Sequence, residues 1–366
     1  MDKKVFRKIV DSGSGDGPRT GLDLPFVSVV MPVRNEAAFI ETSLKSVIRQ
    51  DHPHDLLEIV VADGVSTDTT VDLINKLADQ TDIGLKVVQN PKKIAPAALN
   101  LAIAEAQGEI IVRIDGHCEI EPDYVSNCVR LLRSGKADGV GGPIETVGEG
   151  VVAESISLAM SSGFGVGGSA FRTVNDREMY VDTVAFPGYT REIIERAGPF
   201  NEELVRNQDD EYNFRIRKLG GRILLSPTIR SKYYSRSSFR SLWRQYFQYG
   251  YWKVRVLQLH PRQMSIRQFV PFIFVVSLIL LSIVSMFSST GRWLLFLLII
   301  SYLLANIAAA INTARRRLIL VPFVSVSFFI LHCSYGLGSL TGLFAFRNQW
   351  NEPSELTADR AFESVP

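Results

Sequence analysis

Two short acidic motifs, Asp115-Gly116-His117 and Gln208-Asp209-Asp210-Glu211, carry side chains that can hold a metal ion or accept a proton. In the first motif a carboxylate and an imidazole lie two residues apart, in a turn that Gly116 permits, so both could face one divalent ion. Oxygen-rich ligation with retained waters suits Mg²⁺ or Mn²⁺, and such an ion can bridge two phosphates of a nucleoside diphosphate. A structural alternative, in which Asp115 caps a turn and His117 packs nearby, fits the triplet equally well.

The second motif could supply a general base. A sugar hydroxyl is a poor nucleophile, so a carboxylate has to take its proton as it attacks. Crowding of Asp209, Asp210 and Glu211 would raise the pKa of one acid toward that role. The alternative is a helix start with its acids at the positive end of the dipole, because a basic, helical run follows at 215–218.

Two further polar segments could contact a nucleotide. Pro32-Val33-Arg34-Asn35-Glu36 continues directly from an apolar run, and Asp63 ends another. A carboxylate at that place could accept hydrogen bonds from a base or a ribose. After Asp63, Ser66 or Thr67 is expected to cap a helix that has Asp68 in its first turn.

An alternation of short strands and helices is expected to position these motifs. The apolar runs 26–32, 58–62, 85–89 and 110–114 read as strands, and helical spacing marks 37–49, the segment around 71–77, and 97–106. This pattern predicts an α/β fold with a mostly parallel sheet, which binds ligands at the carboxyl ends of its strands. Three of the polar segments should therefore meet at one edge. Neither a GxGxxG motif nor a P-loop follows the first strand, which disfavours a dehydrogenase-type dinucleotide fold and a P-loop enzyme.

Long apolar blocks follow this region. Segments 269–290 and 293–311 are free of charge and long enough to span a hydrocarbon core of about 30 Å. Segment 318–346 is also free of charge but contains Pro322 and His332, so it could form one tilted span or a broken pair. Basic residues crowd the stretch before the first block and the loop 315–317, whereas only Arg292 lies between the first two blocks. The positive-inside rule predicts a multi-pass protein of the cytoplasmic (inner) membrane with its head in the cytoplasm, and an external C-terminus if the third block crosses once.

The segment 239–258 mixes aromatic residues with arginines just before the first apolar block, which is typical of a helix at a membrane interface. Arg240, Arg244 or Arg255 could meet a lipid diphosphate there. The alternative is a surface anchor that has no role in substrate binding.

Composition narrows the function classes. A net charge of +2 argues against a nucleic-acid binder. The three cysteines form no CxxC pair, which disfavours a disulfide framework or a structural zinc site and fits a reducing compartment. The expected organisation is a flexible lead-in without the apolar core of a signal peptide (1–24), a catalytic domain (25–235), an interfacial segment (236–268), a membrane region of about three helices (269–346) and a polar tail (347–366).

The motifs resemble those of family-2 glycosyltransferases with a GT-A fold, most closely a succinoglycan-biosynthesis-like subgroup with C-terminal membrane helices. The resemblance extends from about Phe26 to Phe346. It implies the GT-A fold of nucleotide-diphospho-sugar transferases. It also implies the following nucleotide-sugar-binding residues: Pro32, Val33, Arg34, Glu36, Asp63 and Asp115.

The remaining roles also come from the resemblance. Asp115-Gly116-His117 is similar to the family's Asp-x-Asp motif with His in the third place, so Asp115 and His117 would hold Mg²⁺ or Mn²⁺. The segment 208–211 is similar to its Glu-Asp-x-Asp motif, which makes Asp209 the implied base and Asp210 its neighbour. The implied acceptor-side residues are Gly188, Tyr189, Arg191, Glu211, Gln248 and Trp252.

The resemblance implies that the protein transfers one sugar, with inversion, from a nucleotide diphosphate sugar in which the nucleotide is UDP. The acceptor implied is a polyprenyl-diphosphate-linked glycan in exopolysaccharide or cell-surface polysaccharide assembly. Processive members carry Gln-x-x-Arg-Trp, but here Tyr251 stands before Trp252, which favours single transfer. The alternatives are a processive synthase and a catalytically silent membrane scaffold. A nucleotidyltransferase is disfavoured because segment 33–36 lacks glycine.

Overall fold

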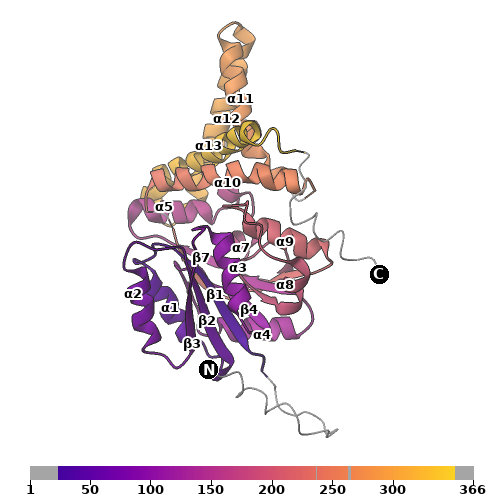
Figure 1. The fold of residues 1–366 in the computed structure, drawn as a ribbon. Coiled ribbons are helices and arrows are strands. Elements are labelled where there is room, and N and C mark those ends of the chain that lie inside the picture. Colours follow the sequence, from indigo (N-terminus) through magenta and orange to yellow (C-terminus); the bar gives the residue numbers. More distant parts are fainter. Residues whose placement is uncertain (1–23, 236, 263–264, 351–366) are drawn as a thin grey trace, which may run out of the picture.

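The computed structural model describes residues 24–235, 237–262 and 265–350. The expected lead-in 1–24 and tail 347–366 lie, except for their innermost residues, outside the described residues. Figure 1 shows an α/β body with an elongated helical part that projects from it. The body holds the acidic motifs, and the helical part begins after residue 238.

The main sheet has eight strands in the order β3-β2-β1-β4-β9-β6-β10-β8. Strands β1 to β4 are mutually parallel and form within one or two residues of the predicted runs. Strand β9 runs antiparallel to both β4 and β6, and β8 runs antiparallel to β10. The sheet is thus mostly parallel, as predicted. Its strands are β1 (Val27–Val33), β2 (Leu57–Asp63), β3 (Gly84–Gln89), β4 (Ile110–Arg113), β6 (Gly139–Gly142), β8 (Met179–Tyr180), β9 (Ala185–Thr190) and β10 (Ile223–Leu225).

A second, three-stranded sheet lies beside the end of β4, and the sequence pattern gave no signal for it. It consists of β5 (Cys118–Ile120), β11 (Ser231–Tyr234) and β7 (Ile144–Val147) in the order β5-β11-β7. Strand β5 starts directly after the Asp115-Gly116-His117 turn, so this small sheet holds the chain in place at the C-terminal end of that motif.

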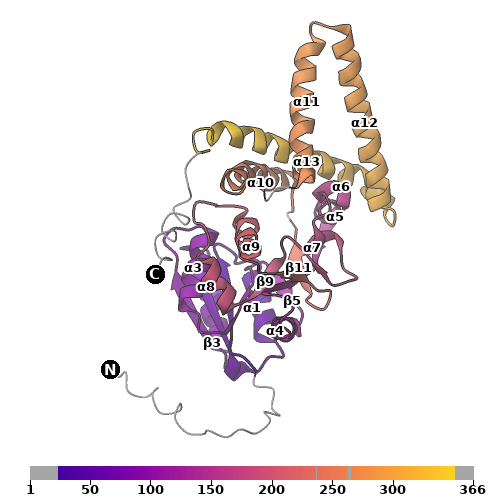
Figure 2. The same ribbon diagram turned by 90° about the vertical axis from the view of Figure 1, so that its right-hand side faces the viewer.

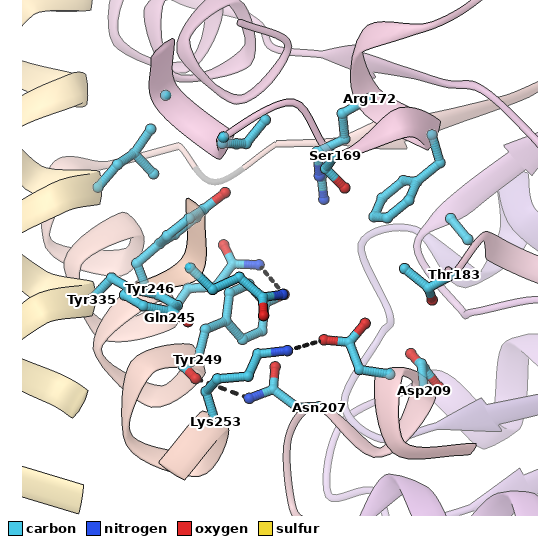
Figure 3. A pocket seen from close by; sticks show the side chains of 18 of the residues that line it. Ser169, Arg172, Thr183, Asn207, Asp209, Gln245, Tyr246, Tyr249, Lys253 and Tyr335 are labelled. Atoms are coloured by element: carbon cyan, nitrogen blue, oxygen red, sulfur yellow. Dashed lines mark hydrogen bonds and ion pairs between the residues drawn. The ribbon is translucent and has the colours of Figure 1, made fainter. Parts of the chain in front are cut away.

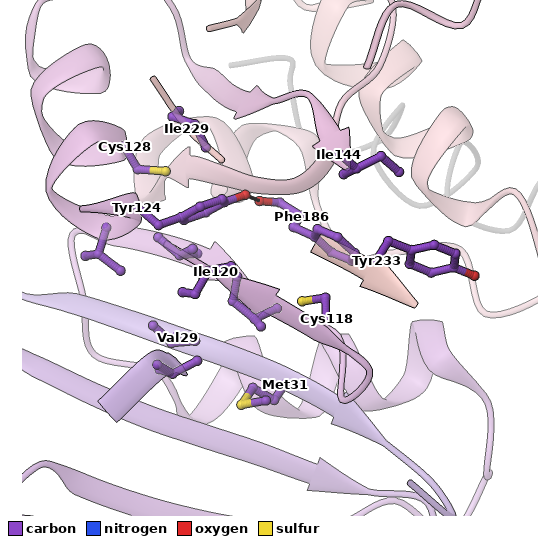
Figure 4. Close-up of a cluster of buried hydrophobic side chains, with 14 of the residues drawn as sticks. Val29, Met31, Cys118, Ile120, Tyr124, Cys128, Ile144, Phe186, Ile229 and Tyr233 are labelled. Atoms are coloured by element: carbon purple, nitrogen blue, oxygen red, sulfur yellow. Dashed lines mark hydrogen bonds between the residues drawn. The ribbon is translucent and has the colours of Figure 1, made fainter. Parts of the chain in front are cut away.

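Alternate residues of β1 serve two cores, because successive side chains of a strand point to opposite faces of the sheet. Val29 and Met31 pack with helices α1, α2 and α4, as Figure 4 shows around Cys118 and Tyr124. Val30 packs on the other face with α3, α8 and α9. These helices are α1 (Ile40–Ile48), α2 (Thr70–Ala78), α3 (Ala95–Glu105), α4 (Tyr124–Arg133), α8 (Arg191–Ala197) and α9 (Gln208–Lys218).

The segment between β7 and β8 lies next to the C-terminal helices. It contains α5 (Gly150–Met160) and the short helices α6 (Gly163–Val166) and α7 (Ala170–Thr173). Phe164 of α6 stacks edge-on against Phe328, and its carbonyl oxygen lies 2.9 Å from His332 Nε2. The glycine-rich region 163–168 is therefore held against the last helix.

Three helices of the described chain are long and apolar enough to cross a membrane. Helices α11 (Val270–Ser285) and α12 (Ser289–Thr313) run side by side as a hairpin that projects from the body (Figures 1 and 2). Helix α13 (Val321–Ala345) is continuous, so segment 318–346 is not a broken pair. It lies across the base of the hairpin beside α10 (Phe239–Leu259), and 44% of its apolar stretch is buried in the protein, against 6% and 11% for the hairpin helices.

Glycines let the backbones of α10 and α13 touch. A Cβ atom added to Gly338 would lie 2.1 Å from the carbonyl oxygen of Phe247, and one added to Gly250 would lie 2.0 Å from that of Tyr335. Both distances are far below any van der Waals contact. The backbones of α10 and α13 are therefore closer together than larger residues at these two positions would allow.

Replacing Gly338 by Leu is expected to destabilise the protein by about 1–3 kcal/mol or more, because the new side chain has to push α10 away from α13. The measurement is the thermal unfolding midpoint of the detergent-solubilised protein. Gly84→Ala is the matched control, since a Cβ at the start of β3 meets nothing within 4 Å. An unchanged midpoint for Gly338→Leu would show that the helices do not pack in this way.

Candidate active site

A cavity of about 640 Å³ lies between the end of the main sheet and the C-terminal helices. Asp115, His117, Asp209 and Asp210 line it on the side of the sheet. Side chains of α10 line the opposite wall, and Figure 3 shows Lys253 of that helix reaching toward the acids at the start of α9. The two acidic motifs, which are far apart in sequence, therefore share one cavity.

Arg113, the last residue of β4, joins the two motifs. Its Nε donates to Asp115 Oδ1 at 3.0 Å, and a terminal guanidinium nitrogen donates to the carboxylate of Asp209. The side chain is only 8% exposed. Burial opposes its charge, but the attraction of the two carboxylates outweighs burial and raises the pKa of Arg113.

Asp209 is linked to Asp115 through the guanidinium of Arg113. Its side chain is 38% exposed, and partial desolvation in the cavity raises its pKa above the ordinary value. The charges of Asp115 and Asp210 act in the same direction, whereas Arg113 opposes them. A carboxyl group whose pKa is raised can take a proton at a less acidic pH. This property suits a general base.

Asp210 and Glu211 have different partners. Asp210 forms an ion pair with Lys253 of α10, and both residues line the cavity. Glu211 is 2% exposed and accepts from Arg215 at 2.7 Å, with His260 Nε2 at 3.0 Å. Burial alone would raise the pKa of Glu211, but these two partners lower it. Glu211 does not line the cavity, so the structure gives it a structural position and not the acceptor-side one that the motif implied.

The Asp115 motif carries two kinds of side chain, a carboxylate and an imidazole, that a divalent ion accepts as ligands. His117 Nδ1 lies 2.9 Å from Glu36 Oε1, so Nδ1–H can donate to that carboxylate and leave Nε2 as a ligand. Among the described residues, no group of three or more His, Cys, Asp or Glu side chains is placed to hold a metal. An ion bound by Asp115 and His117 would therefore keep waters or take phosphate oxygens, as Mg²⁺ and Mn²⁺ do.

Hydrogen bonds tie together the ends of β1 and β2. Asn35 adopts a left-handed conformation with φ of 54°, and its backbone N–H donates to Ser66 Oγ at 2.9 Å. Ser66 also donates from its backbone N–H and its hydroxyl to the carboxylate of Asp63, and Thr67 N–H donates to Asn35 Oδ1 at 2.8 Å. The expectation that Ser66 or Thr67 caps the next helix is wrong, because α2 begins only at Thr70 and these residues bond to Asp63 and Asn35 instead.

The other predicted nucleotide residues lie at the same edge of the sheet. Pro32 and Val33 are paired with Ala62 and Asp63 in the parallel ladder, and Arg34 is exposed beside them. Asp63 is 5% exposed. The ends of β1, β2 and β4 thus lie together, as expected for a parallel sheet.

The predicted acceptor-side residues of β9 and α8 do not face the cavity. Gly188 lies within the sheet, where it pairs with Val112 and Val140. The hydroxyl of Tyr189 is buried and donates to Asn213 at 2.6 Å, and Arg191 donates to the carbonyl oxygens of Gly108 and Ala106.

The predicted α10 residues also point elsewhere. Trp252 Nε1 donates to Gln248 Oε1 at 3.1 Å, and neither side chain lines the cavity. The α10 residues that do are Gln245, Tyr246, Tyr249 and Lys253, which are three or four residues apart, or adjacent, and so lie on one broad helix face. Gln248 and Trp252 precede Tyr249 and Lys253 by one position, which rotates them by about 100° off this face.

Comparisons with known proteins show that this chain is similar to glycosyltransferases. A family model described as glycosyl transferase family 2 matches residues 28–197. A Methanococcus voltae protein named dolichyl N-acetyl-alpha-D-glucosaminyl phosphate 3-beta-D-2,3-diacetamido-2,3-dideoxy-beta-D-glucuronosyltransferase is 30% identical over 325 residues, which cover 87% of this chain and 97% of that protein. Succinoglycan biosynthesis protein ExoA of Rhizobium meliloti (strain 1021) is 31% identical over 249 residues, 66% of this chain and 73% of ExoA.

A solved structure resembles this one over most of its length. It is the mannosyltransferase PcManGT from Pyrobaculum calidifontis in complex with GDP-Man and Mn²⁺, with a TM-score of 0.57, 20% identity and coverage of 88% of each chain. At this identity the likeness concerns the fold alone. It confirms the fold class that the sequence motifs implied.

Proposed function

We propose that this chain, which belongs to glycosyl transferase family 2, transfers one sugar from a UDP-sugar to a lipid-linked glycan. The relative from Methanococcus voltae is named for a dolichyl N-acetylglucosaminyl phosphate, which supports an acceptor that is attached to a lipid. ExoA is named for succinoglycan biosynthesis, which supports a role in exopolysaccharide or cell-surface polysaccharide assembly.

The observation that carries the proposal is the bridge from Asp115 through Arg113 to Asp209. It brings the acid that would face the donor diphosphate close to the acid that would face the acceptor hydroxyl. Asp209 takes the proton of that hydroxyl, whose oxygen attacks the anomeric carbon, and the nucleoside diphosphate leaves with the electrons of the broken bond. Attack from the face opposite to the leaving group inverts the configuration of that carbon.

Arg113 has a positioning role in this scheme. Its guanidinium fixes the orientation of both carboxylates and keeps Asp209 from being repelled by Asp115. The donor set Asp115 and His117 would hold Mg²⁺ or Mn²⁺, which when bound stabilises the negative charge that develops on the diphosphate. Pro32, Val33, Arg34, Glu36 and Asp63 are proposed to bind the nucleotide sugar at the same edge of the sheet.

We place the protein in the cytoplasmic (inner) membrane with the catalytic sheet in the cytoplasm. The basic residues 315–317 lie at the base of the hairpin, on the side of the sheet, and Arg292 lies near its tip. Because α13 lies across the hairpin base beside α10, we expect residue 345 to be on the cytoplasmic side too. This differs from the external C-terminus expected for a third helix that crosses once.

Release of a nucleoside diphosphate by the purified full-length protein tests the function. UDP-, GDP- and dTDP-sugars are supplied in turn with a bacterial lipid extract and Mn²⁺, and the expected result is release from one donor that stops on chelation. The products are then separated by size. Products of many different lengths would show that the protein is a processive synthase and does not transfer a single sugar. No release of nucleoside diphosphate from any donor would favour the catalytically silent scaffold.

A further inference from the structure

The cavity extends well beyond the acids, toward the apolar helices. Its far end is lined by Val270, Pro271 and Phe274 at the start of α11 and by Leu331 of α13. Both helices belong to the part of the chain that is apolar enough for a membrane. One continuous space therefore connects the proposed base with a surface that suits hydrocarbon.

Arg172 of α7 also lines this cavity (Figure 3). It is half-buried, and its guanidinium lies 5.3 Å from the ring centre of Phe171 and 5.6 Å from that of Tyr233. Its guanidinium donates to the neutral hydroxyl of Thr146 at 3.3 Å. Within the part of the chain that the structure describes, no carboxylate pairs with Arg172, although the other inner cations of the cavity, Arg113 and Lys253, are paired in this way.

A second arginine enters from the first residues before α11. Arg267 donates to the carbonyl oxygen of Gly168 at 2.7 Å and lies 3.4 Å from the carboxylate of Asp182. Gly168 lies in the loop between α6 and α7, two residues before the start of α7, the helix that carries Arg172. Arg267 therefore holds the loop that leads into α7, and its own charge is partly balanced by Asp182, which also lines the cavity.

Two side chains that line the cavity each carry a fully buried polar atom without a hydrogen-bond partner among the described residues. These atoms are the amide oxygen Oε1 of Gln245 on α10 and the hydroxyl of Tyr335 on α13. Buried polar groups are nearly always hydrogen-bonded, and leaving one unpaired costs free energy. Figure 3 shows Gln245 and Tyr335 on the α10–α13 side of the cavity, across the open space from Arg172, so a sugar ring between them would meet polar side chains.

We infer that Arg172, supported by Arg267, binds the phosphate of a lipid phosphate acceptor whose hydrocarbon chain leaves the cavity between α11 and α13. The inference rests on the proposed function and adds to it the place and the chemical class of the acceptor. The first sugar lies against Gln245 and Tyr335, and the reacting hydroxyl points to Asp209. Arginine suits this role because its planar guanidinium forms two parallel hydrogen bonds with a phosphate.

The arginines that the sequence suggested for a lipid diphosphate do not reach this cavity. Arg255 is 3% exposed and is paired with Glu203 at 2.9 Å. Arg240 and Arg244 are exposed on α10 and do not line the cavity. The segment 163–172, which sequence patterns left without a predicted fold, supplies the cation instead.

Binding of farnesyl phosphate to the full-length protein in an uncharged detergent tests the site without any need for turnover. Tryptophan fluorescence reports the binding, and Arg172→Ala is expected to weaken it about 10- to 100-fold, the range for losing a hydrogen bond to a charged group. Farnesol and inorganic phosphate, used as separate probes, should each bind far more weakly than farnesyl phosphate. Arg240→Ala is the matched control and should bind like the wild type.

The kinetic form of the test uses the lipid-linked acceptor once the donor is known. Arg172→Ala should raise the KM for the acceptor about 10- to 100-fold and leave the KM for the donor nearly unchanged. Arg172→Lys, which keeps the charge, should recover part of the loss. Equal binding of farnesyl phosphate by wild type and Arg172→Ala, or farnesol binding as tight as farnesyl phosphate binding, would overturn the inference. Tight farnesyl phosphate binding without transfer from any donor would instead refute the proposed function and leave the site in place.

Discussion

Asp209→Asn is expected to slow sugar transfer by about 10²- to 10⁴-fold, the usual contribution of a general base. The amide has the shape of the carboxylate and still accepts a hydrogen bond from Arg113, but it cannot take the proton of the acceptor hydroxyl. Binding of the nucleoside diphosphate should remain nearly intact, because the proposed nucleotide residues lie at the ends of β1 and β2. Single-turnover rates with the donor and the lipid acceptor give the measurement.

Asp210→Asn is the matched control for this experiment. Asp210 is adjacent and lines the same cavity, but its carboxylate pairs with Lys253 and not with Arg113. We expect a much smaller loss of rate for this variant. If Asp210→Asn were inactive and Asp209→Asn active, the base would be Asp210 and the motif would be displaced by one residue.

The pH profile of the wild type should agree with this assignment. The base acts when it is ionised, and partial desolvation in the cavity raises the pKa of Asp209 above that of an ordinary aspartate. The transfer rate should therefore fall on the acidic side at a higher pH than the ordinary pKa of about 3.9 would give. A rate that stayed constant down to that pH would contradict Asp209 as the base.

Asp115→Asn is expected to lower transfer by about 10³-fold, because a bound divalent ion contributes several kcal/mol to the stabilisation of the leaving group. The variant should also lose the strengthening of UDP binding by Mn²⁺. UDP binding with and without Mn²⁺, measured by calorimetry, separates this effect from a loosened Arg113. UDP binding that still responds to Mn²⁺ in the variant would remove Asp115 from the metal site.

Glu36→Gln is expected to lower the activity less than Asp115→Asn does. Glu36 orients His117 through Nδ1, and loss of such a support typically costs about 10- to 100-fold in metal affinity or activity. We expect its activity to return at high Mn²⁺ concentration, whereas Asp115→Asn should stay inactive. Equal responses of the two variants to Mn²⁺ would show that Glu36 does not act through the ion.

Sequence reasoning located the elements whose pattern is local. The strand runs that became β1, β2 and β4 are continuous apolar segments, and the end of each one placed Asn35, Asp63 and Asp115 at a common edge. The hairpin α11–α12 followed from length and lack of charge in the same way. These predictions depend on neighbours in the chain, which the sequence displays directly.

The features that were missed depend on contacts between distant segments. Arg113 stands in the run Ile110 to Ile114, and an arginine in a buried strand needs a carboxylate partner, which was the one available signal. That its second partner would be Asp209, 96 residues away, needed the fold. The face of α10 that lines the cavity was also unpredictable, because both faces carry aromatic and polar residues and only packing on α13 selects between them.

In the proposed arrangement, the close packing of α10 on α13 at Gly250 and Gly338 would also set the height of the reaction above the lipid. Helix α10 cannot move closer to α13, and from the same helix Lys253 holds Asp210, next to the proposed base, while the carbonyl oxygen of Tyr249 accepts from Asn207 at 2.9 Å. An acceptor that is anchored by its lipid tail would then offer to Asp209 only the hydroxyl that lies at this height. After one addition the new terminal sugar would extend beyond that level. Such a molecular ruler would end elongation after a single step without any separate signal for termination.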